Sequence, residues 1–302
     1  MVMPVTSFVR VLAPRLRKLC VVAMLCLLTS LTLAQQSQLG WVSGNCQRGS
    51  GTYVFGNGDH YQGQCRNNQF EGRGTLIFSN GDRYDGQFSR DQMNGQGTYQ
   101  YANGDQFKGQ FSRGVRLGQG SLIRANGERY DGQWRNDRMS GMGTYQYRNG
   151  DHYEGQWQDG ERHGQGTYVR ANGDSYTGQF VDNQREGQGI MTWADGNVYR
   201  GQWRNGQQHG QGEMVQNDGD RYTGQWQDGE MHGNGTMHYA NGARYEGEFA
   251  DNQLDGQGIY YYRNGDRLEG TWENGLQEGY ATYTPANGEP ERMYFNRGEN
   301  IG

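Results

Sequence analysis

One recurring pattern decides the fold of this chain. In the middle of the sequence it reads Tyr153-Glu154-Gly155-Gln156-Trp157, then Gly164-Gln165-Gly166-Thr167-Tyr168, then Asn172-Gly173-Asp174. Its leading aromatic residue returns every 23 residues without an insertion, at Tyr61, Tyr84, Phe107, Tyr130, Tyr153, Tyr176, Tyr199, Tyr222 and Tyr245, and Leu268 takes the same place once more. Such a regular period indicates a repeat architecture.

The spacing within each repeat predicts a β-hairpin. Counting the leading residue as position 0, positions 0, 2 and 4 hold an aromatic residue, a glycine and a second aromatic residue, as in Tyr153, Gly155 and Trp157. These positions alternate with polar residues and therefore share one face of a strand, while positions 11, 13 and 15 share one face of a second strand. Pairing position 2 with position 13 closes the hairpin around positions 6 to 9. It also places position 15 beside position 0 of the next repeat, after an Asn-Gly tight turn.

The strand glycines are expected to be covered by rings. Glycine inside a strand is costly and usually marks the close approach of another group. Tyrosine and tryptophan rings beside it can lie over its bare backbone and pack on one another. Aliphatic residues are scarce after residue 34, so this stacking is expected to replace a conventional core.

These residues at this period closely resemble the MORN repeat family. Ten repeats begin at residues 61, 84, 107, 130, 153, 176, 199, 222, 245 and 268. A degenerate repeat over residues 38–60 precedes them as a cap and carries Gln38 and Val42 at its aromatic positions. The resemblance implies an all-β, elongated single-sheet antiparallel β-hairpin repeat that serves as a scaffold or contact surface. The array extends over residues 61–290, which leaves residues 291–302 as a C-terminal tail.

Composition excludes some functions. Residues 1–34 hold four of the 28 basic residues and no acidic residue, so the remainder carries a formal charge of −9. A net acidic body is a poor electrostatic match to nucleic acid, and no nucleic-acid partner is expected. No cofactor is expected either.

Residues 1–34 are predicted to be a signal peptide. Arg10, Arg15, Arg17 and Lys18 form a basic start, and the apolar run from Leu19 to Leu28 is followed by a small residue at Ala34. The run is shorter than the roughly 20 residues of a membrane-spanning helix. An exported protein in the periplasm, at the cell surface or secreted is therefore favoured over one with a retained anchor, and the composition suggests a bacterial source.

Two cysteines remain after removal of such a signal. An even cysteine count in an exported chain favours a disulfide, here between Cys46 and Cys65. The predicted register places Cys65 opposite Gly49, three residues from Cys46, so that the bridge needs a modest local adjustment. It would join the degenerate repeat to the first regular one.

Other recurring polar residues are expected to be structural. His163, His209 and His232 share position 10, but adjacent repeats are about 10 Å apart, too far for two ligands of one zinc ion. The aspartates of the Asn-Gly-Asp turns raise the alternative of calcium. A turn aspartate that bonds nearby backbone amides is the simpler interpretation. No catalytic and no metal-binding residues are therefore predicted.

The aromatic ladder has two interpretations. It is either the core itself, which we favour because the chain has no other apolar mass for one, or a contact surface for a peptide, glycan or lipid head group. The ladder residues in question are Tyr130, Trp134, Tyr153, Trp157, Tyr176, Tyr199, Trp203, Tyr222, Trp226 and Trp272.

The leading functional hypothesis is a non-catalytic exported scaffold that binds a protein partner or associates with itself. A module on a membrane lipid surface is the alternative, although the acidic body lacks a basic patch. A glycan-binding or wall-acting protein is a third hypothesis. An enzyme of this kind would need a carboxylate pair in a cleft, which a regular sheet offers poorly.

Overall fold

The computed structural model describes residues 39–302, so the predicted signal peptide and Gln38 lie outside the described range. Two compact units divide the chain, one ending at Leu117 and the other running from Gly118 to Gly302. Every regular element among the described residues is a β-strand. Residues 39–302 contain no helix long and apolar enough to cross a membrane.

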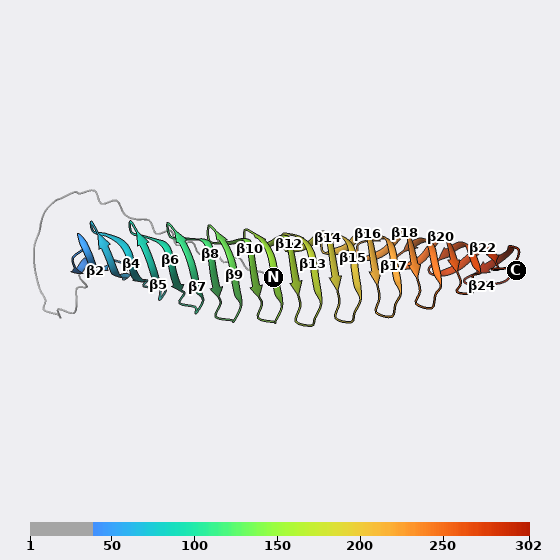
Figure 1. The fold of residues 1–302 in the computed structure, drawn as a ribbon, viewed down its shortest axis with the longest axis horizontal. Coiled ribbons are helices and arrows are strands. Elements are labelled where there is room, and N and C mark those ends of the chain that lie inside the picture. The colour runs from blue at the N-terminus through green and yellow to red at the C-terminus, as the bar shows by residue number, and fades with distance from the viewer. Residues whose placement is uncertain (1–38) are drawn as a thin grey trace, which may run out of the picture. The chain divides into compact units, whose positions relative to one another are not determined.

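The first unit consists of successive antiparallel hairpins (Figure 1). Its strands are β1 (Gly40–Gly44), β2 (Arg48–Val54), β3 (His60–Arg66), β4 (Gln69–Ile77), β5 (Arg83–Ser89), β6 (Gln92–Gln100) and β7 (Gln106–Ser112). Strand β8 (Val115–Ile123) contains the boundary between the units.

The second unit repeats the same arrangement, strand after strand (Figure 1). Its strands are β9 (Arg129–Arg135), β10 (Arg138–Gln146), β11 (His152–Gln158), β12 (Glu161–Val169), β13 (Ser175–Val181), β14 (Gln184–Thr192), β15 (Val198–Arg204), β16 (Gln207–Val215), β17 (Arg221–Gln227), β18 (Glu230–His238), β19 (Arg244–Ala250), β20 (Gln253–Tyr261), β21 (Arg267–Glu273), β22 (Leu276–Thr284), β23 (Glu291–Asn296) and β24 (Glu299–Asn300). The prediction of an all-β antiparallel hairpin repeat is confirmed. The stretch expected to be a tail after residue 290 contains the last two strands.

The predicted register is observed in the central repeats. Gly155 pairs with Gly166 inside one hairpin, and Tyr168 pairs with Tyr176 of the following repeat. The hairpin closes through two residues, Asp159 and Gly160, both with positive φ as a two-residue turn requires. The longer Arg170–Asp174 turn differs from the predicted tight Asn-Gly turn, because only its glycine has a positive φ.

A β-bulge interrupts each regular hairpin, and the sequence patterns did not predict it. Gly155 faces Gly166, but Trp157 faces Arg162, so three residues of β12 stand opposite Gln156 alone. The Gln156 side-chain oxygen accepts a hydrogen bond from the Gln165 amide at 2.8 Å, which satisfies a donor that the ladder leaves free. Gly164 lies in this bulge with φ +65°, and a Cβ there would stand 2.9 Å from Cδ of Gln156.

The core is built from rings that lie on glycine. The side chain of Tyr153 is fully buried, and a Cβ added to Gly166 would lie 2.6 Å from its ring carbon Cε2. The hydroxyl of Tyr153 reaches past the glycine and donates to the Gln156 carbonyl at 2.9 Å. Its ring meets Trp157 edge to face at 5.1 Å between centroids and Phe180 of the next repeat at 5.3 Å. The ring and the glycine pair therefore form one packing unit that also touches the neighbouring repeat.

The last full repeat shows what happens when the ring is missing. Leu268 replaces the leading tyrosine, and Ala281 stands at the position that is glycine elsewhere. Both side chains are buried, at 4% and 3% exposure. A methyl group at position 13 thus fits only where no tyrosine ring covers the position, which supports the ring as the reason for glycine.

In the degenerate first repeat a different residue supplies the ring that covers glycine. Val42 was assigned to an aromatic position, but Trp41 takes the role instead, because β1 and β2 shift register after Trp41. Trp41 packs edge to face on Tyr53 and Tyr61 at 5.3 and 6.3 Å, and a Cβ on Gly51 would lie 3.0 Å from its ring.

Replacing one covered glycine should destabilise the first unit. In Gly97→Ala the new methyl group would stand 2.5 Å from Cζ of the fully buried Tyr84 ring. We expect this variant to lose about 1–3 kcal/mol of unfolding free energy, as overpacked cores do, measured by urea denaturation.

The matched control is Gly56→Ala in the same unit. Gly56 has no positive φ, its nearest atom is 4.0 Å away, and the equivalent position of the repeat two further along the chain is Ala102. This variant should match the parent or gain up to about 1 kcal/mol. Equal losses in both variants would show that glycine freedom, and not the ring, sets the requirement.

Candidate functional site

The candidate site arises where the repeat pattern changes. Position 9 pairs with position 4 and is apolar in five repeats, at Phe70, Met93, Met139, Met231 and Leu254. It is polar in the other five, at Arg116, Arg162, Arg185, Gln208 and Gln277. Arginine occupies it in two adjacent repeats, at Arg162 in β12 and Arg185 in β14. The guanidinium of Arg162 lies 4.8 Å from the ring centroid of Tyr168, and that of Arg185 lies 4.3 Å from that of Trp203. These arginines thus take over the ring-covering role of the apolar residues.

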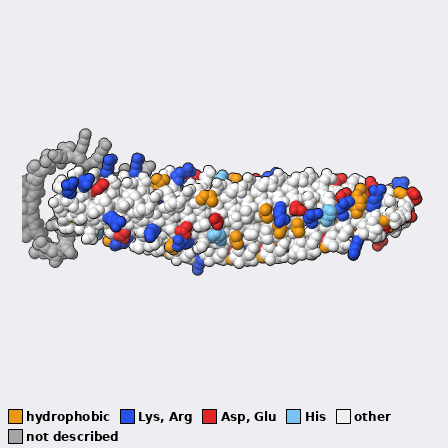
Figure 2. Space-filling view, in the orientation of Figure 1, with side chains coloured by type: hydrophobic (Ala, Val, Ile, Leu, Met, Phe, Trp, Pro, Cys, Tyr) orange, Lys and Arg blue, Asp and Glu red, His pale blue; other side chains and the backbone are white. Residues whose placement is uncertain are grey.

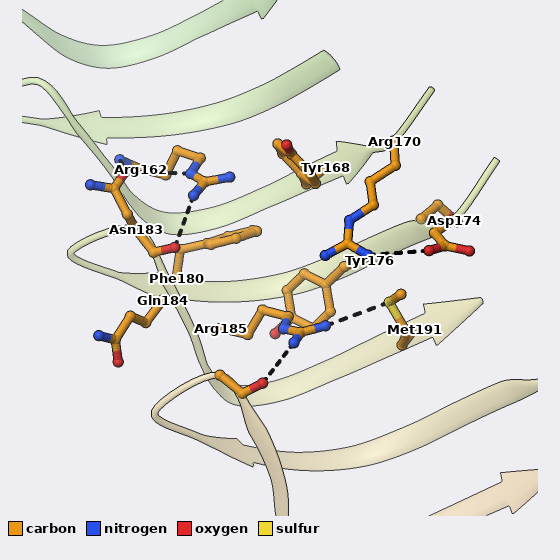
Figure 3. A pocket seen from close by; sticks show the side chains of 12 residues that line it. Arg162, Tyr168, Arg170, Asp174, Tyr176, Phe180, Asn183, Gln184, Arg185 and Met191 are labelled. Carbon is orange, nitrogen blue, oxygen red and sulfur yellow. Dashed lines mark hydrogen bonds and ion pairs between the residues drawn. The ribbon is translucent and has the colours of Figure 1, made fainter. Parts of the chain in front are cut away.

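Each guanidinium is tied to the hairpin that follows its own. Arg162 donates from Nη2 to the Asn183 carbonyl at 3.0 Å, and Nε lies 3.4 Å from the Asn183 side-chain oxygen. Arg185 donates from Nη2 to the Gly206 carbonyl at 2.7 Å, and its Nη1 contacts the sulfur of Met191 at 3.7 Å. Figure 3 shows these contacts. The two side chains are held in place by backbone acceptors rather than by carboxylates.

Together with Arg170 they line a cavity of about 300 Å³, whose walls also include Tyr168, Tyr176 and Phe180 (Figure 3). Arg170 pairs with Asp174 at 3.3 Å. Within residues 39–302, no acidic side chain lies within ion-pair distance of Arg162 or Arg185. Burial lowers the pKa of Arg185, and the nearby charges of Arg170 and Arg162 lower it further. The cavity therefore holds three positive charges against one negative charge. We call it the arginine cavity.

The tyrosines of the cavity serve as protonated hydrogen-bond donors. Burial raises the pKa of Tyr176 to about 12. Its hydroxyl donates to the Gln179 carbonyl at 3.0 Å. Tyr176 therefore adds no charge to the cavity.

The opposite face of the strands is polar and open. In the first unit a trough of about 510 Å³ runs over the paired glycines and is lined by residues such as Arg73, Asp85 and Lys108. In the second unit a trough of similar volume is lined by Ser121, Asp131 and Glu154, among others. Charged and hydrophobic side chains are scattered over the face seen in Figure 2. The first trough carries both signs of charge, whereas the charged side chains that line the second, Asp131 and Glu154, are both acidic.

The predicted aromatic ladder is the core. Its ten residues are between 0% and 9% exposed. The rings alternate along the second unit in edge-to-face contacts, for example from Tyr199 to Trp203 and from Tyr199 to Trp226. Trp157 and Trp203 also donate their indole N–H groups to glycine carbonyls of the preceding repeat. The ten rings are therefore packed as a core, and among them only Tyr176 also lines the arginine cavity.

Cys46 and Cys65 are joined in a disulfide with a Cα–Cα distance of 5.0 Å. Gly49 lies opposite Cys65, and the chain before β2 folds back so that Cys46 meets the turn after β3. There the Cys46 carbonyl accepts a hydrogen bond from the Asn68 amide at 2.7 Å. The bridge therefore links the degenerate repeat to the first regular one.

The turn aspartates act between repeats. The expected partners are nearby backbone amides, and the side-chain oxygen of Asp266 accepts from the Ala286 amide of the next turn at 2.9 Å. Its second oxygen accepts from the Tyr283 hydroxyl. These bonds, with one from Asn264, lower the pKa of Asp266. Asn197 accepts from the Asn217 amide in the same way at 2.9 Å. The side chains at this position of the repeat, Asp266 and Asn197 among them, thus link one repeat to the next by hydrogen bonds.

The histidines of position 10 lie within the bulged strands β12, β16 and β18. His163 and His209 have Nδ1 within 3.6 and 3.9 Å of Asp182 and Asp228, respectively. No group of three histidine, cysteine or acidic residues within residues 39–302 is placed to hold a metal ion.

Two features of the sequence were overlooked. Glutamine recurs at position 3, where it fills the bulge, and this column is visible in the sequence as Gln64, Gln87, Gln110, Gln133, Gln156, Gln179, Gln202 and Gln225. The arginines at position 9 stand in a column that is apolar in only half of the repeats, so the sequence does not mark them as a site. Finding them requires knowing that position 9 covers the rings, which depends on the bulge.

The comparisons with known proteins establish the family. The MORN repeat model matches residues 47–60, 61–83, 84–106, 107–129, 130–152, 153–175, 176–198, 199–221, 222–244, 245–267 and 269–289. The chain therefore belongs to the MORN repeat family, and the predicted resemblance is confirmed. The search of curated proteins finds no match.

Solved structures show only a weak likeness. The TCP domain of Drosophila melanogaster SAS-4, in complex with a proline-rich motif of Ana2, is 12% identical over 51% of this chain and 85% of that chain, with a TM-score of 0.34. The wild-type TCP10 domain of Danio rerio CPAP is 12% identical over 81% and 99%, with a TM-score of 0.26. Virginiamycin B lyase from Staphylococcus aureus is 10% identical over 85% and 87%, with a TM-score of 0.14. These scores support no conclusion about function.

The hydrogen bonds of the turn aspartates predict that the folded chain becomes less stable at acidic pH. A carboxylate whose pKa is lower in the folded chain stabilises it above its unfolded pKa of about 3.9, and this contribution is lost as the pH falls through the folded value. In Asp266→Asn, the amide oxygen can keep the Ala286 bond, as Asn197 does in its own repeat. The urea midpoint should therefore decline less steeply between about pH 5 and pH 2 than in the parent. An unchanged slope would exclude this role for Asp266.

Proposed function

We propose that this MORN repeat protein is a non-catalytic exported scaffold that binds a protein partner. The proposal rests on the observation that some positions of each repeat build the fold, whereas others face outward. Recurring residues such as Tyr153, Gly166 and Gln156 are used by the fold, in the core and in the bulges. The outward position 1 varies between repeats, as in Asp85, Lys108 and Glu154, and lines the open troughs. A constant frame with a variable surface suits specific contact with a macromolecule.

Export is supported by two independent features. The basic and apolar composition of residues 1–34 has the form of a signal peptide. The disulfide between Cys46 and Cys65 belongs to an oxidising compartment. The proposed location is therefore the periplasm, the cell surface or the extracellular space.

A protein partner is favoured over an anionic membrane on electrostatic grounds. The chain after residue 34 has a formal charge of −9, which opposes approach to anionic lipid head groups. The mixed-sign trough that contains Arg73, Asp85 and Lys108 can instead pair with individual polar groups of a protein surface.

The proposal is tested by capture of native complexes. The full chain with a C-terminal tag, expressed in its source cells, should be recovered from the envelope or extracellular fraction with an N-terminus near residue 35. It should carry the same partner protein, or further copies of itself, in independent preparations. Mass spectrometry identifies both.

Liposomes of anionic phospholipid provide the control for the membrane alternative. The purified chain should remain in the supernatant after co-sedimentation at low salt. Recovery from the cytosol, the absence of any reproducible partner or self-association, or quantitative binding to the liposomes would each contradict the proposal.

A further inference from the structure

The clustering of charge in the arginine cavity is not required by the fold. At the position of its two central arginines, Met139 and Met231 cover the same kind of ring pair without charge. The third arginine of this column, Arg116, does not line the cavity. A partly buried guanidinium without a carboxylate partner is costly, and methionine or leucine would fill the space without that cost. Two such arginines in adjacent repeats place their charges on one cavity. The feature therefore indicates a ligand that supplies the missing negative charge.

Donors remain available for such a ligand. A guanidinium has five N–H groups. Arg162 directs two of them to Asn183, and Arg185 directs two to Gly206 and Met191. Each therefore keeps three N–H groups, and its planar fork matches a carboxylate in bidentate geometry. Arg170 adds a third positive charge, although it shares Asp174.

The residues that line the cavity restrict the chemical class of the ligand. Tyr168, Tyr176 and Phe180 line the same space as the guanidinium groups. Tyr176 and Phe180 are only 2% exposed, whereas Tyr168 is partly exposed. A bare inorganic anion would satisfy the charges and leave the exposed part of Tyr168 uncovered. A carboxylate on a short hydrocarbon stem would satisfy both. The volume of about 300 Å³ exceeds the roughly 30 Å³ of one water molecule about tenfold, which leaves room for more than one such side chain.

We propose that the arginine cavity binds aspartate or glutamate side chains of an acidic peptide segment in the protein partner. This inference rests on the proposed scaffold function and assigns the chemistry of one contact. The acidic body gives no long-range attraction for such a segment, so that recognition depends on short-range pairing inside the cavity.

Fluorescence anisotropy of fluorescein-labelled hexaglutamate tests the inference, with labelled hexaglutamine as the neutral probe. The parent should bind hexaglutamate and not hexaglutamine. The double variant Arg162→Met/Arg185→Met should weaken hexaglutamate binding at least tenfold. Methionine is the residue that position 9 carries at Met139, so this variant should keep the parent's β-sheet circular dichroism and its urea midpoint.

The matched control is Arg116→Met, which removes an arginine from the same column outside the cavity. Arg116 lies 5.5 Å from the Phe107 ring centroid and does not line the cavity. Its substitution should change hexaglutamate affinity less than twofold. Equal weakening in both variants would indicate a general charge effect and overturn the site. So would parent-like binding by the double variant, or no binding of hexaglutamate by the parent.

Competition separates carboxylate from phosphate. At equal ionic strength, glutarate should displace labelled hexaglutamate more effectively than inorganic phosphate does, because only glutarate can also cover the exposed part of Tyr168. Stronger displacement by phosphate would assign the cavity to a different anion.

Native capture with the double variant then distinguishes the two proposals. Loss of the partner supports both proposals. A partner retained by the double variant overturns the cavity inference and leaves the scaffold intact.

Discussion

A tyrosine ring lying on a pair of glycines is the interaction on which the rest of the structure depends. In a sheet with few aliphatic residues, the apolar area must come from rings, and a ring covers most when nothing separates it from the backbone. Tyr153 illustrates this, because it is fully buried over Gly166 while its hydroxyl is satisfied by the Gln156 carbonyl. The edge-to-face contacts of Tyr153 with Trp157 and Phe180 then extend the packing into the next repeat. One geometric demand therefore fixes the glycine column, the ring columns and the contact between repeats.

Much of this was readable from the sequence, because periodicity reports which residues share a face. The pairing of Gly155 with Gly166 and of Tyr168 with Tyr176 follows from spacing alone. The bulge did not follow, because position 11 looks like a strand glycine until its positive φ is known, as in Gly164. The role of Trp41 was missed for a related reason, since a local register shift moved the ring by one residue from its expected position.

The arginine cavity could not be predicted from the periodicity of the sequence. A repeat pattern shows what recurs, whereas a specific contact depends on what does not recur. Arg162 and Arg185 are conspicuous only once position 9 is known to cover rings, and their shared cavity is visible only in three dimensions (Figure 3). The recurring residues make the fold predictable, but the candidate site is formed by residues that do not recur. Its location therefore could not be predicted from the spacing of the repeats.

The ring-on-glycine account is tested most directly by a double-mutant cycle at Tyr153 and Gly166, followed by urea denaturation. Gly166→Ala alone should be destabilising. In the Tyr153→Leu background the same change should cost much less, with a coupling of at least about 1 kcal/mol, because Leu268 and Ala281 already coexist in the last full repeat. Strictly additive losses would show that the ring does not set the glycine requirement and would contradict the account.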